Sequence, residues 1–458
     1  MKILLKGGRV VNGGGWQEAD ILMEGEKISQ VGKDLPESGA QVVDVRGKWI
    51  FPGFIDAHTH FDLEVAGTVT ADGFDTGTKA ALGGGTTMVI DFATQYKGES
   101  LHEALENWHR KADKVSSCDY GFHLAISDWN QDISRELESV IEEGVSSFKL
   151  YMTYDDMILE DKAIYQVLKR LKELGGIAGV HCENSGIIKA LVAEEKARGN
   201  LSPSAHGKTR PAAAEAEAVS RLLKIGALAK APVIVVHLSS GIGYQEVKYA
   251  RERGQEVYVE TCPQYLLLDE SLYDLPGFEG GRYVIAPPLR GEKDRTRLWN
   301  ALRKGQIQTV STDHCSFTLA QKDMGREDFT KIPGGMAGVE TRPVLLYTYG
   351  VEKGLLTVEQ MCRVLSENPA KLYGVYPEKG CIKAGSDADL VVWDPEISWV
   401  LTRENQMANV DYQAYEGFPV KGRAEKVYLR GRLAAANGRI VREYEGKYVA
   451  RGRYQKVE

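Results

Sequence analysis

Five side chains of metal-ligand type stand at the ends of strand-like apolar runs in this sequence. His58 and His60 are one residue apart, and on an extended chain such side chains point to the same side. His181, His237 and Asp313 each end or follow a further apolar run. Imidazole and carboxylate are ligands that a borderline divalent cation such as zinc prefers. Each residue alone is more often a core or surface residue, but their joint placement predicts a catalytic metal site.

Lys149 ends another apolar run, at residues 146–150. An ammonium group cannot bind a metal ion, whereas a lysine amine that has lost its proton can take up carbon dioxide and become a carbamate. A carbamate is in effect a carboxylate with two oxygens, which suits it to bridging two cations. An ordinary salt-bridged lysine is the alternative interpretation, and the position of Lys149 among the other ligand types favours the carbamate.

The remaining histidines lack this joint placement; they are His102, His109, His123, His206 and His314. The first two lie on a polar helical surface, where we expect them to be solvated. The third lies inside a strand and is expected to be structural. His314 follows Asp313 directly and is left without an assigned role.

Eight short apolar runs, each ending in polar residues, would position the ligand side chains. They are residues 54–58, 87–91, 121–126, 146–150, 177–181, 233–237, 257–261 and 308–312. Helical patterns lie between them, for example at 101–115, 133–143, 162–173 and 244–253. This alternation predicts an α/β fold, a (β/α)8 TIM barrel, in which reactive groups lie at the carboxyl ends of the strands.

A doubly wound open sheet is the main alternative fold. No GxGxxG motif follows the first strand, and Gly83-Gly84-Gly85 lies at a helix-to-strand junction. This glycine run is better explained as a helix C-cap than as a phosphate loop. Two long intervals, 181–233 and 261–308, are expected to build the mouth of the site.

Short strand-like segments separated by turns fill both ends of the chain. Candidates are residues 2–6, 9–11, 19–24, 27–31 and 41–44, and then 389–393, 426–429 and 440–441. We therefore predict a smaller β-sandwich domain built from both termini, residues 1–50 plus 375–458. The barrel would occupy residues 51–374.

The composition excludes several classes of protein. The 458 residues include 57 basic and 64 acidic side chains, a net charge of −7, which argues against nucleic acid or an anionic membrane as the partner. Six cysteines are scattered without a CxxC pair, which favours reduced thiols. The sequence shows no secretory signal and no apolar run long enough for a membrane span. We expect a cytoplasmic protein that acts on a small molecule.

A set of short motifs runs through almost the whole chain, at residues 52–60, 148–152, 180–184, 236–239, 260–266, 287–290, 311–315, 380–394, 411–412 and 415–417. Together they resemble the dihydropyrimidinase/hydantoinase group of the amidohydrolase superfamily, and the chain looks D-hydantoinase-like. The resemblance implies two divalent metal ions, usually zinc. The implied ligands are His58, His60 and Asp313 for one ion, His181 and His237 for the other, and carbamylated Lys149 (N6-carboxylysine) as a bridge.

The implied reaction is hydrolysis of the ring amide of a dihydropyrimidine or hydantoin to an N-carbamoyl amino acid. Two cations would lower the pKa of a bridging water, so that a hydroxide near neutral pH attacks the amide carbonyl. Tyr154 matches the family's tyrosine that stabilises the oxyanion, and Asp313 would pass a proton to the leaving ring nitrogen. Without the resemblance, Tyr154 would be taken for a packing residue of a loop.

Two positions depart from the pattern of the group. Ala286 stands where Ser is usual before two prolines, and Gly334 stands where Asn is usual in a Lys-Ile-Pro-Asn-Gly loop. The family binds the ureide ring mainly through backbone groups here, so both residues and Tyr154 are predicted to bind substrate. The identity of the substrate stays open.

Three functions remain after these arguments. The first is a dihydropyrimidinase or hydantoinase acting on a small cyclic ureide, in a homotetramer as is common in the family. The second is an allantoinase, a dihydroorotase or another cyclic-ureide amidohydrolase. The third is a non-catalytic tetrameric scaffold related to dihydropyrimidinase, which the presence of all six ligand residues argues against.

Overall fold

The computed structural model describes residues 2–457, and most of them form a barrel of eight parallel strands. Its strands are β6 (Phe54–Thr59), β9 (Thr86–Thr94), β10 (Asp119–Ala125), β11 (Ser147–Tyr151), β12 (Ile177–His181), β13 (Val233–Val235), β14 (Val257–Thr261) and β15 (Thr309–Val310), and each pairs with the next in chain order. Main-chain hydrogen bonds from His314 to His58 and His60 close the gap between the first and last strands: His60 N donates to His314 O at 2.8 Å, and His314 N donates to His58 O at 3.3 Å. The predicted (β/α)8 TIM barrel is confirmed.

The barrel strands are apolar because both of their faces are covered. All nine residues of β9 are buried, as are all five of β12 and of β14. A parallel sheet between a packed interior and an outer layer of helices gives such continuous apolar runs rather than an alternating pattern.

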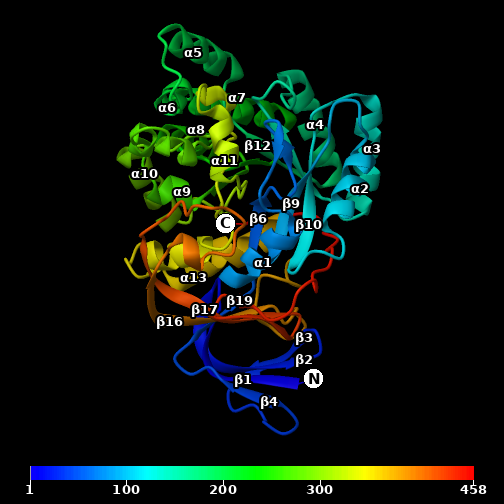
Figure 1. The fold of residues 1–458 in the computed structure, drawn as a ribbon. Helices are drawn as coiled ribbons and strands as arrows, with labels where there is room; N and C mark the ends of the chain where they lie inside the picture. The colour runs from blue at the N-terminus through cyan, green and yellow to red at the C-terminus, as the bar shows by residue number, and fades with distance from the viewer. Residues whose placement is uncertain (1, 458) are drawn as a thin grey trace.

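Amphipathic helices surround the barrel (Figure 1). The four predicted helices are found as α2 (Leu101–Ala112), α3 (Gln131–Glu142), α4 (Asp161–Leu174) and α8 (Gly241–Glu252), joined by α7 (Ala212–Ala229) and α10 (Glu292–Arg303). Helix α2 begins at Ser100 with a capping box to Glu103 and buries Trp108. Helix α1 (Phe74–Gly84) ends at Gly85, whose φ of 98° is left-handed, so the glycine run is a C-cap as predicted.

Further helices, most of them short, fill the connections between the larger elements. They are α5 (Ser185–Ala197), α6 (Ser204–Thr209), α9 (Pro263–Leu267), α11 (Leu319–Lys322), α12 (Arg342–Leu346), α13 (Val358–Cys362) and α14 (Asn368–Leu372). The two long intervals of the sequence meet in space, because His206 of α6 packs its ring against Tyr273 in the 3-10 helix η1 (Glu270–Asp274). A two-stranded ribbon, β7 (Glu64–Val65) and β8 (Thr68–Val69), follows the first barrel strand.

Both ends of the chain build one nine-stranded mixed sheet, as expected for a small β domain. Its strands are β1 (Lys2–Asn12), β2 (Gly15–Glu24), β3 (Lys27–Gly32), β4 (Gln41–Asp44), β5 (Trp49–Pro52), β16 (Leu390–Val400), β17 (Pro419–Leu429), β18 (Arg432–Ala436) and β19 (Arg439–Ile440). Strand β5 joins the two halves, because it pairs with β1 in parallel and with β16 in antiparallel. In Figure 1 the C-terminal strands lie above the N-terminal ones, around a core that includes Leu5, Ile21 and Leu390. The exact limits, 1–50 plus 375–458 around a barrel of 51–374, stay a prediction.

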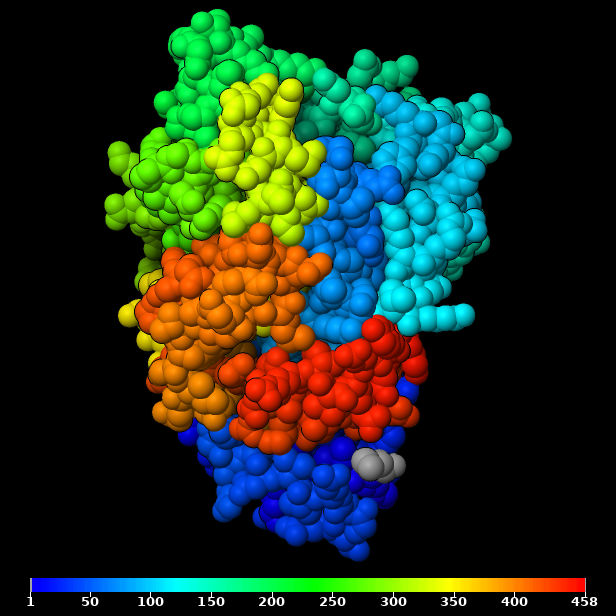
Figure 2. Space-filling view, viewed as in Figure 1, coloured from blue at the N-terminus to red at the C-terminus, as the bar shows by residue number. Residues whose placement is uncertain are grey.

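The last described residues leave the small sheet and run along the barrel. Tyr120 N donates to Lys447 O at 3.0 Å. The side chain of Arg451 is buried and donates to Ser147 Oγ at 2.7 Å and to the carbonyl of Phe122. In Figure 2 the red C-terminal part of the chain lies between the blue N-terminal strands and the barrel. Within residues 2–457, none of the helices is long and apolar enough to cross a membrane.

Candidate metal centre and active site

The pair of histidines at the end of the first barrel strand meets Asp313, which lies just beyond the last one. His60 Nε2 lies 3.1 Å and His58 Nε2 lies 3.3 Å from Asp313 Oδ1. The ligand atoms of the three residues all lie within 4.8 Å of one another. One divalent cation between them would have two imidazoles and a carboxylate, a ligand set typical of zinc.

The other three predicted ligand residues surround the same point. The rings of His181 and His237 are 4.5 Å apart, and the ring of His237 is 5.4 Å from that of His58. Lys149 Nζ lies 3.3 Å from His58 Nε2. Burial lowers the pKa of His58, His181 and His237, so these imidazoles are neutral and able to bind a metal. The six residues therefore converge at one end of the barrel.

Three site residues have a backbone conformation that is rare outside glycine. The φ angles of Tyr154, His237 and Asp313 are 69°, 39° and 53°. Left-handed backbone at residues with side chains is costly and collects at functional sites. Here it turns the chain sharply just after β11, β13 and β15, where the side chains enter the barrel mouth.

Glu260, near the end of β14, orients two of the histidines and was missed by the sequence argument. His58 Nδ1 donates to Glu260 Oε1 at 2.6 Å, and the main-chain N–H of His237 donates to the same oxygen at 3.2 Å. The first bond places the proton of His58 on Nδ1 and leaves the lone pair of Nε2 free for a metal. A charged residue inside the apolar run 257–261 is the signal that could have identified it.

Glu183 has the corresponding role for His181. His181 Nε2 donates to Glu183 Oε2 at 2.8 Å, which leaves Nδ1 of this ring as the metal-binding atom. Burial opposes the charge of this carboxylate, but Arg210 and His181 together lower the pKa of Glu183 to about 2. Its position two residues after a predicted ligand is a signal that the sequence did contain.

Asp91 holds the first strand in place. Its Oδ2 accepts from Thr59 Oγ1 at 2.8 Å and from Phe61 N at 2.9 Å, on either side of His60. Its Oδ1 accepts from Trp108 Nε1 of α2 at 3.0 Å. The carboxylate therefore fixes the backbone that carries the histidine pair.

His314, left unassigned above, faces away from the ligand cluster. Its Nε2 donates to Asp72 Oδ2 at 3.0 Å, and its Nδ1 accepts from the main-chain N–H groups of Gly338 and Val339, each at 3.1 Å. Both ring nitrogens are used within the protein, so His314 is a structural residue.

The six predicted ligand residues fit a divalent metal ion. The Nδ1 atoms of His60 and His237 are buried and have no hydrogen-bond partner among residues 2–457, which is unusual for buried polar atoms where no ion or water is bound nearby.

A second cluster of acidic side chains, formed by Asp119, Asp387 and Asp389, does not need a metal ion to balance its charge. Lys379 Nζ lies within 3.0 Å of all three carboxylates, so a lysine already supplies the positive charge there.

The predicted substrate-binding residues lie around this cluster. Tyr154 is partly exposed in the loop after β11, and its ring is 5.1 Å from that of His181. Burial raises the pKa of its hydroxyl, which keeps it a hydrogen-bond donor. Gly334 is exposed with open space at its Cβ position. It lies near Ala286, because Gly335 N donates to Val284 O at 3.0 Å.

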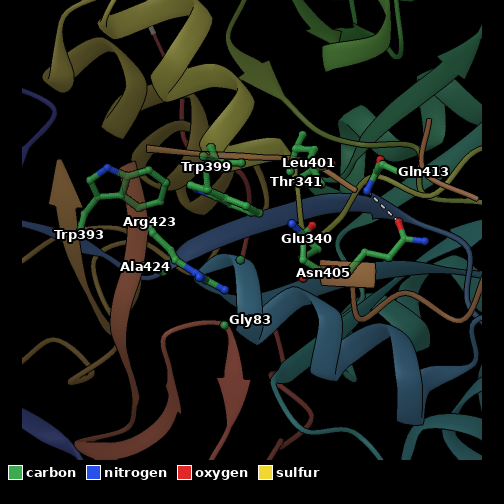
Figure 3. A pocket seen from close by; sticks show the side chains of 14 residues that line it. Gly83, Glu340, Thr341, Trp393, Trp399, Leu401, Asn405, Gln413, Arg423 and Ala424 are labelled. Carbon is green, nitrogen blue, oxygen red and sulfur yellow. Dashed lines mark hydrogen bonds between the residues drawn. The ribbon is translucent and has the colours of Figure 1, made fainter. Parts of the chain in front are cut away.

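A separate crevice lies where the barrel meets the small domain (Figure 3). Its walls include Trp393 and Trp399 on one side and Gly83 and Glu340 on the other. The cavity volume is about 20 Å³, which admits one water molecule and no substrate. It is therefore a packing crevice between domains.

The barrel, with its buried cluster of histidines and carboxylates at the strand ends, defines the class as an α/β-barrel enzyme with a divalent-metal site. Residues 49–434 match the amidohydrolase family. A D-hydantoinase of Geobacillus stearothermophilus is 43% identical over 458 residues, which cover 99% of this chain and 97% of that protein. The crystal structure of a dihydropyrimidinase from Brevibacillus agri matches with a TM-score of 0.98 at 43% identity, over 100% of both chains. The chain thus belongs to the amidohydrolase family, in its dihydropyrimidinase/hydantoinase group.

Proposed function

We propose that this protein is a cyclic amidase that hydrolyses the ring amide of dihydropyrimidines or hydantoins to N-carbamoyl amino acids. The observation that carries the proposal is the convergence of six ligand residues on one buried point, five of them at or just beyond a strand end and Lys149 in the middle of β11. The names of the relatives support it, since those at 43% identity are a D-hydantoinase and a dihydropyrimidinase.

The proposed cofactor is a pair of divalent ions, most simply zinc. His58, His60 and Asp313 would hold one, and His181 and His237 the other. Lys149 would take up carbon dioxide and bridge them as N6-carboxylysine, because burial lowers its pKa and thereby favours the neutral amine. When bound, the two ions would supply a hydroxide nucleophile near neutral pH and polarise the amide carbonyl.

The protein's own residues would then bind the ring and move the proton. The partly exposed backbone of Ala286 and Gly334 would hold the ureide, and Tyr154 would donate a hydrogen bond to the oxygen on which negative charge develops. Asp313 would accept a proton and pass it to the leaving ring nitrogen. Glu260 and Glu183 keep the imidazoles of His58 and His181 in the orientation that this requires.

Allantoinase activity, or the hydrolysis of another cyclic ureide, is the second candidate. One observation favours it: Ala286 and Gly334 replace the Ser and Asn that are usual in hydantoinases. A non-catalytic scaffold would not need the retained ligands or their carboxylate supports. Homotetrameric assembly and a cytoplasmic location remain predictions, the first of which sedimentation analysis would test.

The test is a hydrolysis assay on metal-replete protein with dihydrouracil, hydantoin, both enantiomers of a 5-substituted hydantoin, and allantoin. We expect ring opening of dihydrouracil or the hydantoins, with the N-carbamoyl product identified by mass spectrometry and about two metal ions per chain. Lys149→Ala should abolish turnover, while Lys162→Ala, which removes an exposed lysine of α4, should not. If no ureide is opened, the proposed activity is wrong; near-normal turnover of Lys149→Ala refutes the bridging role.

A further inference from the structure

A lysine away from the metal ligands is buried among main-chain oxygens. Lys322, the last residue of α11, is 1% exposed, and its ammonium donates to the carbonyl groups of Val284 at 3.0 Å, Pro333 at 2.7 Å and Gly335 at 2.8 Å. Among the described residues, no carboxylate forms an ion pair with it. Burial of a charge is costly unless it is hydrogen-bonded, and here all three protons of the ammonium have an acceptor.

The first segment that Lys322 binds, residues 284–287, uses nearly all of its carbonyl groups inside the protein. Val284 O accepts from Lys322, Ile285 O accepts from His206 Nε2 at 2.7 Å, and Pro287 O accepts from the Tyr265 hydroxyl at 2.8 Å. Ala286, the partly exposed residue between them, makes no main-chain hydrogen bond within the part of the chain that the structure describes. Its polar groups are therefore free for a ligand.

The second segment, residues 333–335, shows the same pattern. The carbonyl groups of Pro333 and Gly335 both accept from Lys322, while Gly334 between them is exposed and forms no main-chain hydrogen bond in residues 2–457. Gly335 is also locked from the other side, because a Cβ there would lie 2.2 Å from the carbonyl oxygen of Cys315. One ammonium thus ties together the two segments whose free backbone groups belong to Ala286 and Gly334.

We propose that Lys322 is a positioning residue for substrate, which holds segments 284–287 and 333–335 at the spacing that a cyclic ureide needs. The inference rests on the proposed function, in which the backbone of Ala286 and Gly334 contacts the ring. Lys322 itself touches neither substrate nor metal. Its removal should weaken binding of the ring and leave the metal ligands and the chemical step intact.

The test compares Lys322→Met with Lys331→Met, in which an exposed lysine two residues before Pro333 is replaced by the same side chain. For Lys322→Met, we expect KM for the best cyclic ureide to rise about tenfold or more, with kcat within about threefold of the wild type and unchanged metal content. Lys331→Met should match the wild type, and Lys322→Arg, which keeps N–H donors, should recover part of the lost affinity. A purely structural role would lower thermal stability with KM unchanged, and that result would overturn the proposal.

A second variant covers the case in which Lys322→Met does not fold. Gly335→Ala displaces segment 333–335 through the clash with Cys315 while leaving Lys322 in place, so it should raise KM in the same way; an unchanged KM would contradict the proposal. If the wild type opens no ureide, the proposed function fails separately. In that case, hydrogen exchange of the main-chain amides tests the role of Lys322. We expect the amides of segments 284–287 and 333–335 to exchange faster in Lys322→Met than in Lys331→Met. Equal exchange rates would overturn the role.

Discussion

Glu260→Gln isolates the contribution of a carboxylate that touches no metal. The glutamine has the same shape, and its carbonyl oxygen can still accept from His58 Nδ1 and from the main-chain N–H of His237. What is lost is the negative charge 2.6 Å from the ring nitrogen of His58. That charge makes the imidazole a stronger ligand, so the variant should bind metal more weakly.

The magnitude follows from two independent estimates. A hydrogen bond to a charged group contributes about 1.5–3 kcal/mol, against about 1 kcal/mol for a neutral one. The difference, about 0.5–2 kcal/mol, corresponds to a roughly 2- to 30-fold change in a dissociation constant. Replacement of outer partners of metal ligands typically costs about 10–100-fold, which overlaps this range. We therefore expect zinc to bind about 10- to 30-fold more weakly.

The stability of the metal-free protein should change in the opposite direction. Burial raises the pKa of Glu260, because the charged form is disfavoured in the dry interior. The amide carries no such penalty, so the metal-free variant should melt at the same temperature as the wild type or higher at pH 8. Weaker metal binding therefore cannot be attributed to general destabilisation.

The assay is competition for zinc against a chromogenic chelator, with metal-free wild type, Glu260→Gln and Glu256→Gln. Glu256 is the matched control, since it directly precedes the same strand at its other end, where it pairs with Lys456 near the surface. We expect the control to retain wild-type affinity. Zinc affinity equal to that of the wild type in Glu260→Gln would refute the reasoning that this carboxylate tunes the metal ligand.

Three further results are expected. Tyr154→Phe should lower kcat by roughly 10²–10³-fold with KM little changed, because only the developing oxyanion loses a donor; steady-state kinetics would check this, and an unchanged kcat would contradict the role. Zinc at about 1,000 times its dissociation constant should stabilise the metal-free protein by about 4 kcal/mol, measured by calorimetry, and an unshifted Tm would argue against a built site. Burial raises the pKa of Glu340 to about 7, so the folded protein holds a proton that the unfolded chain has lost, and stability falls as the pH rises from about 4.5 to about 7. Glu340→Gln should remove this dependence and gain up to about 3 kcal/mol at pH 8 in denaturant unfolding, while an equal pH dependence of both proteins would show that another group is responsible.

Much of the fold could be predicted because burial on both faces makes barrel strands apolar throughout. The wrong strand predictions concern segments in which pairing with a neighbouring strand, rather than residue composition, determines the secondary structure. The runs 2–6 and 9–11 form one strand, β1, which continues across an irregularity between Leu5 and Gly8. Strand β18 (Arg432–Ala436) was not predicted, since three of its five residues are alanine, and only its pairing with β17 makes it a strand.

Five of the six ligand residues could be predicted because they lie at or just beyond strand ends, where a barrel places its reactive groups, whereas Lys149 lies in the middle of β11. Apart from Glu183, which lies two residues after His181, the residues that support the ligands could not be predicted, because their partners come from other elements of the chain. Glu260 meets His58 across 202 residues, and Asp91 meets Trp108 of the next helix. In the sequence, Lys322 looks like an ordinary lysine of a polar helix. Only the fold brings the carbonyl groups of residues 284, 333 and 335 around its ammonium group.

Because β5 lies between β1 and β16, it can complete its pairing only after most of the chain has been synthesised. Strand β5 is complete at Pro52, but its partner begins at Leu390, so at about 5–20 residues per second roughly 20–70 s pass before the two can pair. During that time one edge of β5 presents unpaired main-chain groups to other newly made chains. Pro52 shortens this edge, because it has no N–H to offer. The free edge of β5 is therefore a place where nascent copies could pair with one another.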